Sequence, residues 1–171
     1  MELVGLTSTK HTYCIALVFM KQETTKHYAW ALKRLKWLYG DKRPICIMSD
    51  RELGALKAVQ HIFGDVHHFL CQVHVDRNVK TYAKLMRVDP KKFSSSVRRV
   101  LRSHTEQEYE ERLNHFRSTW NSREGGGLVG YVETTWLTPH KEKLVAAWSD
   151  SILHFGTRTS NRWVFNSSHM L

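Results

Sequence analysis

The chain has 171 residues, 42% of them hydrophobic and 25% charged, which is the composition of a folded globular domain and excludes wholesale disorder. Lys and Arg outnumber Asp and Glu by 26 to 16, so the net charge is +10 at neutral pH. This excess favours a polyanionic partner, with nucleic acid ahead of a membrane surface. The longest apolar run, Tyr13–Met20, is far too short to span a bilayer, so we expect no membrane partner.

Three cysteines, Cys14, Cys46 and Cys71, are too few and too irregularly spaced for a disulfide framework, which predicts a reducing compartment. Glu2 follows Met1 with no basic segment before the first apolar run, so we expect no signal peptide.

The first half of the sequence alternates strand and helix patterns. Leu3–Leu6 and Tyr13–Met20 are apolar and β-prone, and the intervening T-S-T-K-H suits a hairpin turn. Thr24 or Thr25 can cap a helix over about residues 26–39. The expected helix ends at Gly40. Its apolar face has helical spacing: Tyr28, Ala31, Leu32, Leu35 and Leu38.

A second strand–helix–strand unit follows. The apolar strand Ile45–Met48 delivers Asp50 at its carboxyl end, where ligands and catalytic groups gather in open α/β sheets. Ser49-x-x-Glu52 is a capping-box pattern for the next helix, which makes Glu52 a capping partner rather than a ligand. The strand Val66–Leu70 then ends in Cys71-x-x-His74.

After His74 the pattern becomes helical. Asp89-Pro90 breaks the first helix, Thr105-x-x-Glu108 is a capping box for another, and Gly125-Gly126-Gly127 is expected to be a loop. Pro139 is expected to begin a last helix, with Leu144, Val145 and Trp148 facing inward.

Positive charge is concentrated in residues 77–102, which hold nine cations against one acid, Asp89. We interpret this cationic stretch as a nucleic-acid-facing surface that contacts phosphates without base specificity, although a solvated helical face is the alternative. Its members are Arg77, Lys80, Lys84, Arg87, Lys91, Lys92, Arg98, Arg99 and Arg102. The five tryptophans Trp30, Trp37, Trp120, Trp136 and Trp148 are expected to be core residues rather than base-stacking platforms.

Several blocks of the sequence, in order and spacing, resemble those of Mutator-like element (MULE) transposases. The run Leu17 to Leu32, the block Ser49-Asp-Arg-Glu-Leu-Gly-Ala-Leu56 and Cys71-Gln-Val-His74 are similar to three of the family's blocks. Trp136-Leu137, Trp148, Phe155-Gly156 and Thr159-Ser-Asn-Arg162 resemble its closing blocks. The far-red-impaired-response transcription factors, which are domesticated relatives, share them.

The resemblance implies an α/β fold with a ribonuclease-H-like core and a helical insertion. It implies a D-D-E triad that holds two Mg²⁺ or Mn²⁺ ions for phosphoryl transfer, with Asp50 as the second acid. The first acid would lie on a strand before Glu2, and the third shortly after Arg162, where this chain has no acid. We therefore expect a core without its first strand, and no catalysis. The expected parts are residues 1–74 (partial core), 75–156 (helical insertion) and 157–171 (start of the last core helix).

In such a sheet the first strand is central, so we expect a distorted sheet or a break between Leu3–Leu6 and Ile45–Met48. The same break predicts a poor independent folder that is prone to self-association. Zinc at Cys71 and His74 is possible only with further ligands, for which His67, His68 and His104 are the candidates; a buried Cys and a helix-start His is the preferred interpretation.

The function predicted from the sequence is a nuclear, catalytically inactive fragment of a MULE-type DNA transposase. The alternative is a domesticated DNA-binding regulator of the far-red-impaired-response type. An unrelated basic helical nucleic-acid binder would not explain the segment from Asp50 to His74.

Overall fold

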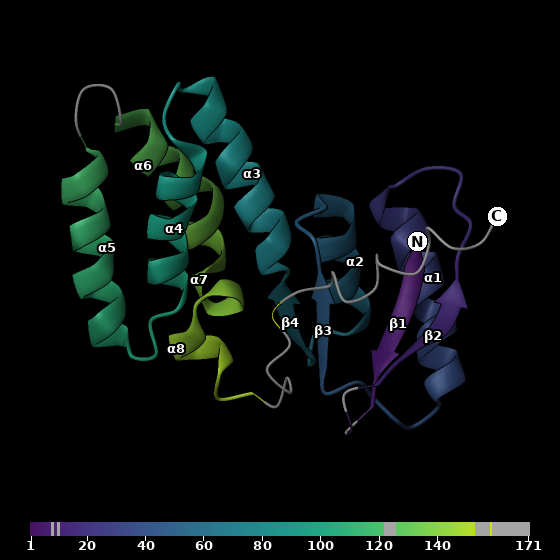
Figure 1. The fold of residues 1–171 in the computed structure, drawn as a ribbon. Helices are drawn as coiled ribbons and strands as arrows, with labels where there is room; N and C mark the ends of the chain where they lie inside the picture. Colours follow the sequence, from purple (N-terminus) through teal and green to yellow (C-terminus); the bar gives the residue numbers. More distant parts are fainter. Residues whose placement is uncertain (8, 10, 122–125, 153–157, 159–171) are drawn as a thin grey trace. The chain divides into compact units, whose positions relative to one another are not determined.

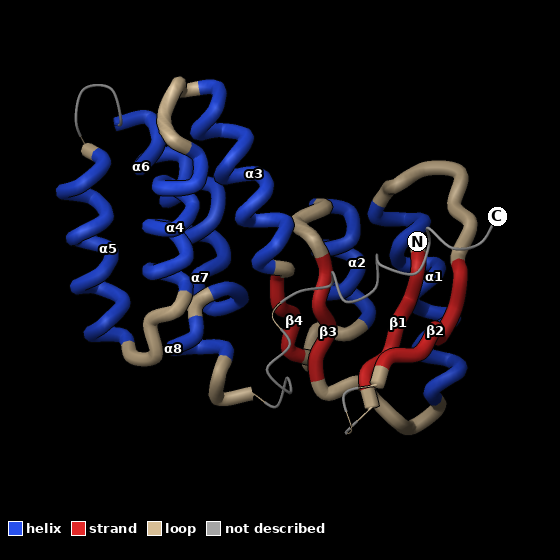
Figure 2. The backbone as a smooth tube through the Cα atoms, viewed as in Figure 1, coloured by secondary structure: helices blue, strands red, loops and turns tan. Residues whose placement is uncertain are grey.

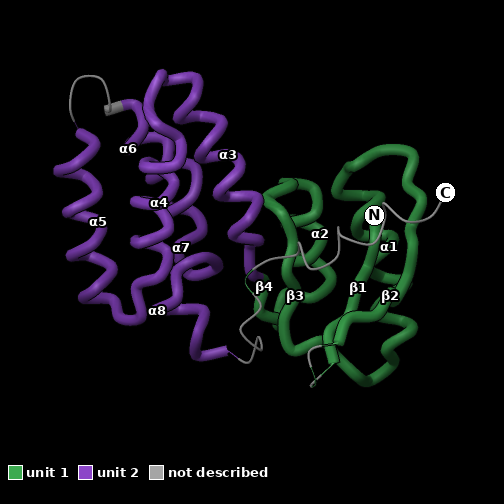
Figure 3. Tube along the Cα trace, in the orientation of Figure 1, with its two compact units in different colours: residues 1–68, 153–171 green, residues 69–152 purple. Residues whose placement is uncertain are grey.

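The computed structural model describes residues 1–7, 9, 11–121, 126–152 and 158 (Figure 1). The elements follow the order strand, strand, helix, strand, helix, strand and then helices, as the sequence predicts, so the mixed α/β class is confirmed. Figure 3 shows two compact units: unit 1 comprises residues 1–68 and 153–171, and unit 2 comprises residues 69–152.

Unit 1 begins with an antiparallel hairpin. Strand β1 (Glu2–Leu6) pairs with β2 (Thr12–Leu17) over the register Glu2↔Leu17 to Leu6↔Thr12. The Thr7 amide donates to the His11 carbonyl at 2.8 Å and closes the predicted turn. The second strand is shorter than the apolar run, because Val18–Met20 lie beyond its last residue.

Helices α1 (Thr25–Tyr39) and α2 (Leu53–Ile62) form the core of unit 1. Their first turns approach closely, since a Cβ added to Gly54 would lie 3.0 Å from the Thr25 nitrogen. Near their other ends, the Lys36 ammonium donates to the Ile62 carbonyl at 2.9 Å. The two helices therefore run side by side in the same direction.

The strands form two separate pairs (Figure 2). Strand β3 (Cys46–Ser49) pairs with β4 (His67–Leu70), and among the described residues no pairing joins β3 to β1. Leu3 of β1, Ile15 of β2 and Ile47 of β3 nevertheless pack against the same α1–α2 core. The predicted break between residues 3–6 and 45–48 is confirmed.

Unit 2 is helical, and aromatic side chains pack against one another in it. The ring of Phe93 lies 5.7 Å from that of Phe116 and 4.9 Å from that of Trp120, and Tyr109 meets Trp148 edge-on at 5.2 Å. The elements are α3 (Gln72–Leu85), α4 (Pro90–Leu101), α5 (Glu106–Trp120), α6 (Gly126–Val132), the π-helical η1 (Glu133–Leu137), α7 (Thr138–Leu144) and α8 (Ala146–Ser149).

Two expectations for unit 2 are wrong in detail. Helix α6 begins at Gly126, so two of the three glycines lie in a helix; Gly125 lies outside the described residues. Pro139 does not begin a separate helix, because α6, η1 and α7 are continuous and Pro139 lies in the first turn of α7. A π-helical turn lies directly before α7, whose second residue is Pro139, and the missing N–H of this proline disrupts the regular hydrogen-bond ladder.

Candidate strand-end site and nucleic-acid interface

Asp50 directly follows β3 and precedes α2, so the predicted place at a strand end is confirmed. Its side chain is exposed, and Oδ1 accepts a long contact from the Glu52 amide at 3.4 Å. The role of Asp50 as a metal ligand stays a prediction.

The predicted capping box at Ser49 is wrong. Helix α2 is capped by Glu52 itself, whose Oε2 accepts from the Ala55 amide at 2.7 Å. Ser49 is still part of β3, and its hydroxyl donates to the Asp50 carbonyl at 2.7 Å and contacts His68 Nε2 at 2.9 Å. The helix starts three residues later than the motif suggests, because Ser49 is held by the neighbouring strand.

Acidic side chains gather where the first turns of α1 and α2 meet. Burial, followed by the charges of Glu23, Glu52 and Asp50, raises the pKa of Tyr28 to about 12. Sequence reasoning missed Glu23, because nothing in its spacing links it to Asp50. Carboxylates at helix N-termini offset the positive ends of the helix dipoles, which is a structural reason for this gathering.

The described residues do not fit a pair of divalent ions. Two metals in a phosphoryl-transfer site need several carboxylate ligands held together. Among the residues that the structure describes, no group of three or more His, Cys, Asp or Glu could hold a metal ion. Asp50 alone is insufficient, so we derive no catalytic step through it.

Cys71 and His74 lie at the start of α3. Cys71 is the N-cap residue, is 1% exposed and makes no side-chain capping bond. His74 is half-buried in the first turn, and no described group hydrogen-bonds its buried Nδ1. Of the other zinc candidates, His104 lies 3.2 Å from an Asp150 oxygen in unit 2, while His67 and His68 belong to β4. Zinc binding stays a prediction.

The cationic stretch covers α3, the following turn and α4. Two of its members share one acid: Lys80 and Arg98 both form ion pairs with Asp76, the latter at 3.1 Å. The others are exposed: Arg77, Lys84, Arg87, Lys91, Lys92, Arg99 and Arg102. The majority of the predicted phosphate-contacting residues are therefore accessible to a ligand.

Arg87 adopts a backbone conformation that usually requires glycine. It has φ +56°, and the amides of Arg87 and Val88 donate to the carbonyls of Lys84 and Ala83. This is the Schellman arrangement that ends a helix, in which the left-handed residue is most often Gly. An exposed arginine stands there instead, at a cost in backbone energy.

The expectation that all five tryptophans are core residues is wrong for two of them. Trp30 is 51% and Trp37 is 76% exposed on α1, and Leu38 beside them is also exposed. Trp136 is buried, while Trp120 and Trp148 are half-buried. Helical spacing places Trp30 and Trp37 on one stripe but does not say which stripe faces the core.

The strand pairs, the two core helices and the start of α3 together form the part of the chain that a known family shares. Residues 1–78 match the family model of the MULE transposase domain. The resemblance to MULE transposases is thus confirmed for this segment, which contains Asp50, Cys71 and His74. No curated protein and no solved structure matched the chain, so the ribonuclease-H-like core stays a prediction. No helix among the described residues is long and apolar enough to cross a membrane.

Proposed function

We propose that this chain is a MULE-transposase-derived protein that binds DNA through its cationic stretch and does not transfer DNA strands itself. The observation that carries the proposal is the match of residues 1–78 to the MULE transposase domain, a family that acts on DNA. The net charge of +10 and the exposed cations of α3 and α4 support it. Lys and Arg side chains release counterions from the DNA backbone and bind it without reading sequence.

Asp50 supports the ancestry rather than an activity. A single exposed carboxylate cannot hold Mg²⁺ or Mn²⁺ in the paired arrangement of a transferase. We therefore propose a nuclear piece of transposase ancestry that is catalytically silent. Phe155-Gly156 and the block Thr159–Arg162, on which part of the resemblance rests, lie outside the described residues.

A domesticated regulator of the far-red-impaired-response type is the second candidate function. It shares the sequence blocks and the expected DNA binding. It differs in predicting sequence-selective association with one genomic region, which chromatin immunoprecipitation of the full chain would reveal.

The absence of catalysis has a direct test. Purified chain is incubated with Mg²⁺ or Mn²⁺ and labelled DNA, and cleaved or joined products are measured. We expect none above background. Activity that vanishes in Asp50→Ala would overturn the proposal of a silent protein.

The DNA-binding surface is tested with two triple variants of equal charge change. Lys91→Glu/Lys92→Glu/Arg102→Glu reverses exposed cations of the stretch, and Lys21→Glu/Lys42→Glu/Lys57→Glu reverses exposed cations of unit 1. In fluorescence anisotropy the first variant should bind DNA at least tenfold more weakly. Its salt slope should flatten by about 0.9 for each phosphate that the protein no longer neutralises. Equal losses of affinity in both variants would mean that only net charge matters.

A further inference from the structure

A small pocket lies between α4 and α5 in unit 2. Its volume is about 50 Å³, and no acid lines it: the lining residues are Ser96, Arg99, Arg112, His115, Phe116 and Thr119. Pockets for organic ligands usually hold about 300–1,000 Å³, whereas a cavity of about 10–15 Å³ already holds one water. The enclosed space therefore suits one small ion.

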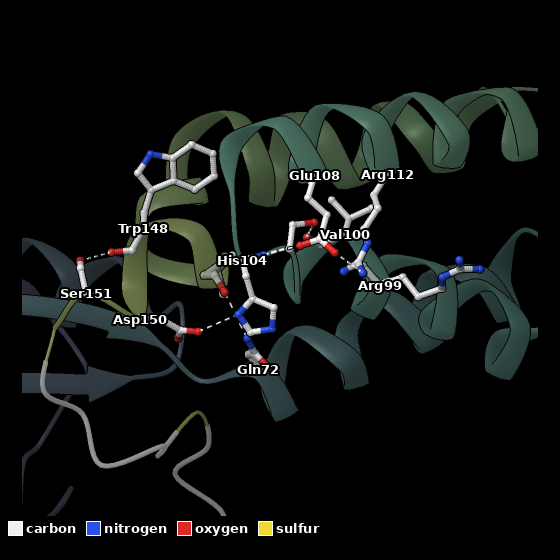
Figure 4. A network of polar contacts seen from close by, with 11 residues as sticks. Gln72, Arg99, Val100, His104, Glu108, Arg112, Trp148, Asp150 and Ser151 are labelled. Atoms are coloured by element: carbon white, nitrogen blue, oxygen red, sulfur yellow. Dashed lines mark hydrogen bonds and ion pairs between the residues drawn. The ribbon is translucent and has the colours of Figure 1, made fainter.

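One wall of the pocket is fixed by Arg112. Its Nη1 donates to the Arg99 carbonyl at 2.9 Å, and its Nη2 forms an ion pair with Glu108, as Figure 4 shows. The Arg99 carbonyl lies in the last turn of α4, where carbonyls lack a partner within the helix. Arg112 thus joins α5 to the end of α4, and three of its five N–H donors are left over.

Arg99 is exposed and lines this pocket, and no hydrogen bond or ion pair with described residues holds its guanidinium, which points away from that of Arg112 in Figure 4. The ring of His115 is likewise exposed and without a described partner. Thr119 contributes a wall rather than a donor, because its hydroxyl already donates to the His115 carbonyl at 2.7 Å. Arg99 and His115, whose side-chain donors are not engaged by described residues, therefore line the same small pocket.

We propose that this pocket binds a single phosphate group. A planar guanidinium donates to two oxygens of a tetrahedral anion at once, which a lysine cannot do. Arg99 supplies this pair of donors, His115 supplies a further N–H, and the fixed Arg112 adds positive charge partly offset by Glu108. The phosphate is that of the DNA backbone or free phosphate, and the first source rests on the proposed DNA binding.

Inorganic phosphate is the first probe, applied to the full chain. Backbone and arginine side-chain NMR signals are followed during titration, with chloride at matched ionic strength as the reference. We expect saturable shifts at Arg99, Arg112 and His115. Arg99→Gln should weaken phosphate binding at least tenfold, and Arg99→Lys should not restore it. Arg102→Gln is the matched control, because it removes an exposed cation of the same helix end that does not line the pocket, and should bind like the parent.

The proposed phosphate site would be overturned if chloride produced the same NMR shifts. It would also be overturned if Arg99→Gln and Arg102→Gln lost phosphate affinity equally. DNA affinity then separates the sources. If the DNA backbone fills the pocket, Arg99→Gln lowers DNA affinity more than Arg102→Gln, and free phosphate competes with DNA. Phosphate binding without any DNA binding would refute the proposed DNA-binding function and support the phosphate site. DNA binding without phosphate-specific shifts would refute the phosphate site and support the proposed function.

Discussion

Units 1 and 2 differ in how completely they bury their large apolar side chains. Nine of the eleven large hydrophobic residues exposed in the described chain lie in unit 1, Phe19 at 93% being the most exposed. Of the twelve largest fully buried side chains, only Phe63 belongs to unit 1. Most of the segment that matches the transposase domain, residues 1–68 of 1–78, therefore lies in the less completely packed unit.

The reason lies in the strands. Two separate two-stranded pairs leave backbone groups along β1 and β3 without ladder partners among the described residues, and an isolated pair is marginally stable in water. Unit 2 buries its apolar face helix against helix and needs no such pairing. We therefore expect local opening of unit 1 at lower free energy than that of unit 2.

The largest contrast between the units should come from two tryptophans. Trp136→Ala in unit 2 removes a side chain that is 1% exposed and should cost about 3–5 kcal/mol in the free energy of unfolding. Trp37→Ala in unit 1 removes one that is 76% exposed and should stay within about 0.5 kcal/mol. Urea denaturation followed by circular dichroism measures both.

Comparable costs for the two substitutions would mean that Trp37 is covered in solution, by a second copy of the chain for instance. Sedimentation velocity of the parent protein and of Trp37→Ala distinguishes this case, because the variant would then lose self-association together with stability.

Tyr28 should make the stability of unit 1 depend on pH in the alkaline range. Its pKa in the folded state is about 12 against the ordinary 10.0, so the folded state holds the proton more tightly than the unfolded state. The protonated Tyr28 therefore adds about 2–3 kcal/mol to the free energy of unfolding. This stabilisation is full below pH 10 and is lost as the pH rises towards 12. Tyr28→Phe should remove this alkaline loss, as measured by denaturation across that range.

Tyr109 is the counterpart in unit 2. Burial and Glu110 raise its pKa, but Arg117 opposes them. Tyr109→Phe should therefore alter the alkaline profile less than Tyr28→Phe. A parent protein whose stability stays flat from pH 9 to 12 would contradict the raised pKa of Tyr28, which burial and then the nearby acids cause.

Local patterns in the sequence predicted the elements well. Thr24 and Thr105 cap helices as expected, Gly40 ends α1, and Asp89-Pro90 separates α3 from α4 as expected, with Asp89 also capping α4. The capping motif at Ser49 failed because a contact with His68, distant in sequence, holds Ser49 in β3. Local propensity decides where a helix begins unless contacts with a neighbouring element hold the capping residue in another conformation.

The candidate sites were less predictable than the elements. The end of β3 placed Asp50 correctly, but the pairing of Lys80 and Arg98 with Asp76 depends on how α3 and α4 pack. The pocket at Arg99 and His115 depends on the packing of α4 against α5, and the α5 residues lie outside the cationic stretch. Helical periodicity says which residues share a stripe, and only tertiary packing says which stripe is exposed.

The smallest effects expected come from the two residues with positive φ, Gly40 of unit 1 at φ +58° and Arg87 of unit 2 at φ +56°. A side chain costs about 1 kcal/mol in the left-handed helical conformation, and the backbone of Gly40, with ψ −123°, lies in a region that is still less favourable for a side chain. Gly40→Arg should lower stability by at least about 1 kcal/mol, since no atom lies within 4 Å of the added Cβ and only the backbone term acts. Arg87→Gly should raise stability by a similar amount, and should weaken DNA binding if Arg87 contacts phosphate. Thermal unfolding measures the two changes in stability and anisotropy the change in DNA affinity. If Arg87→Gly instead destabilises the protein, the arginine side chain makes a stabilising contact that outweighs its backbone cost.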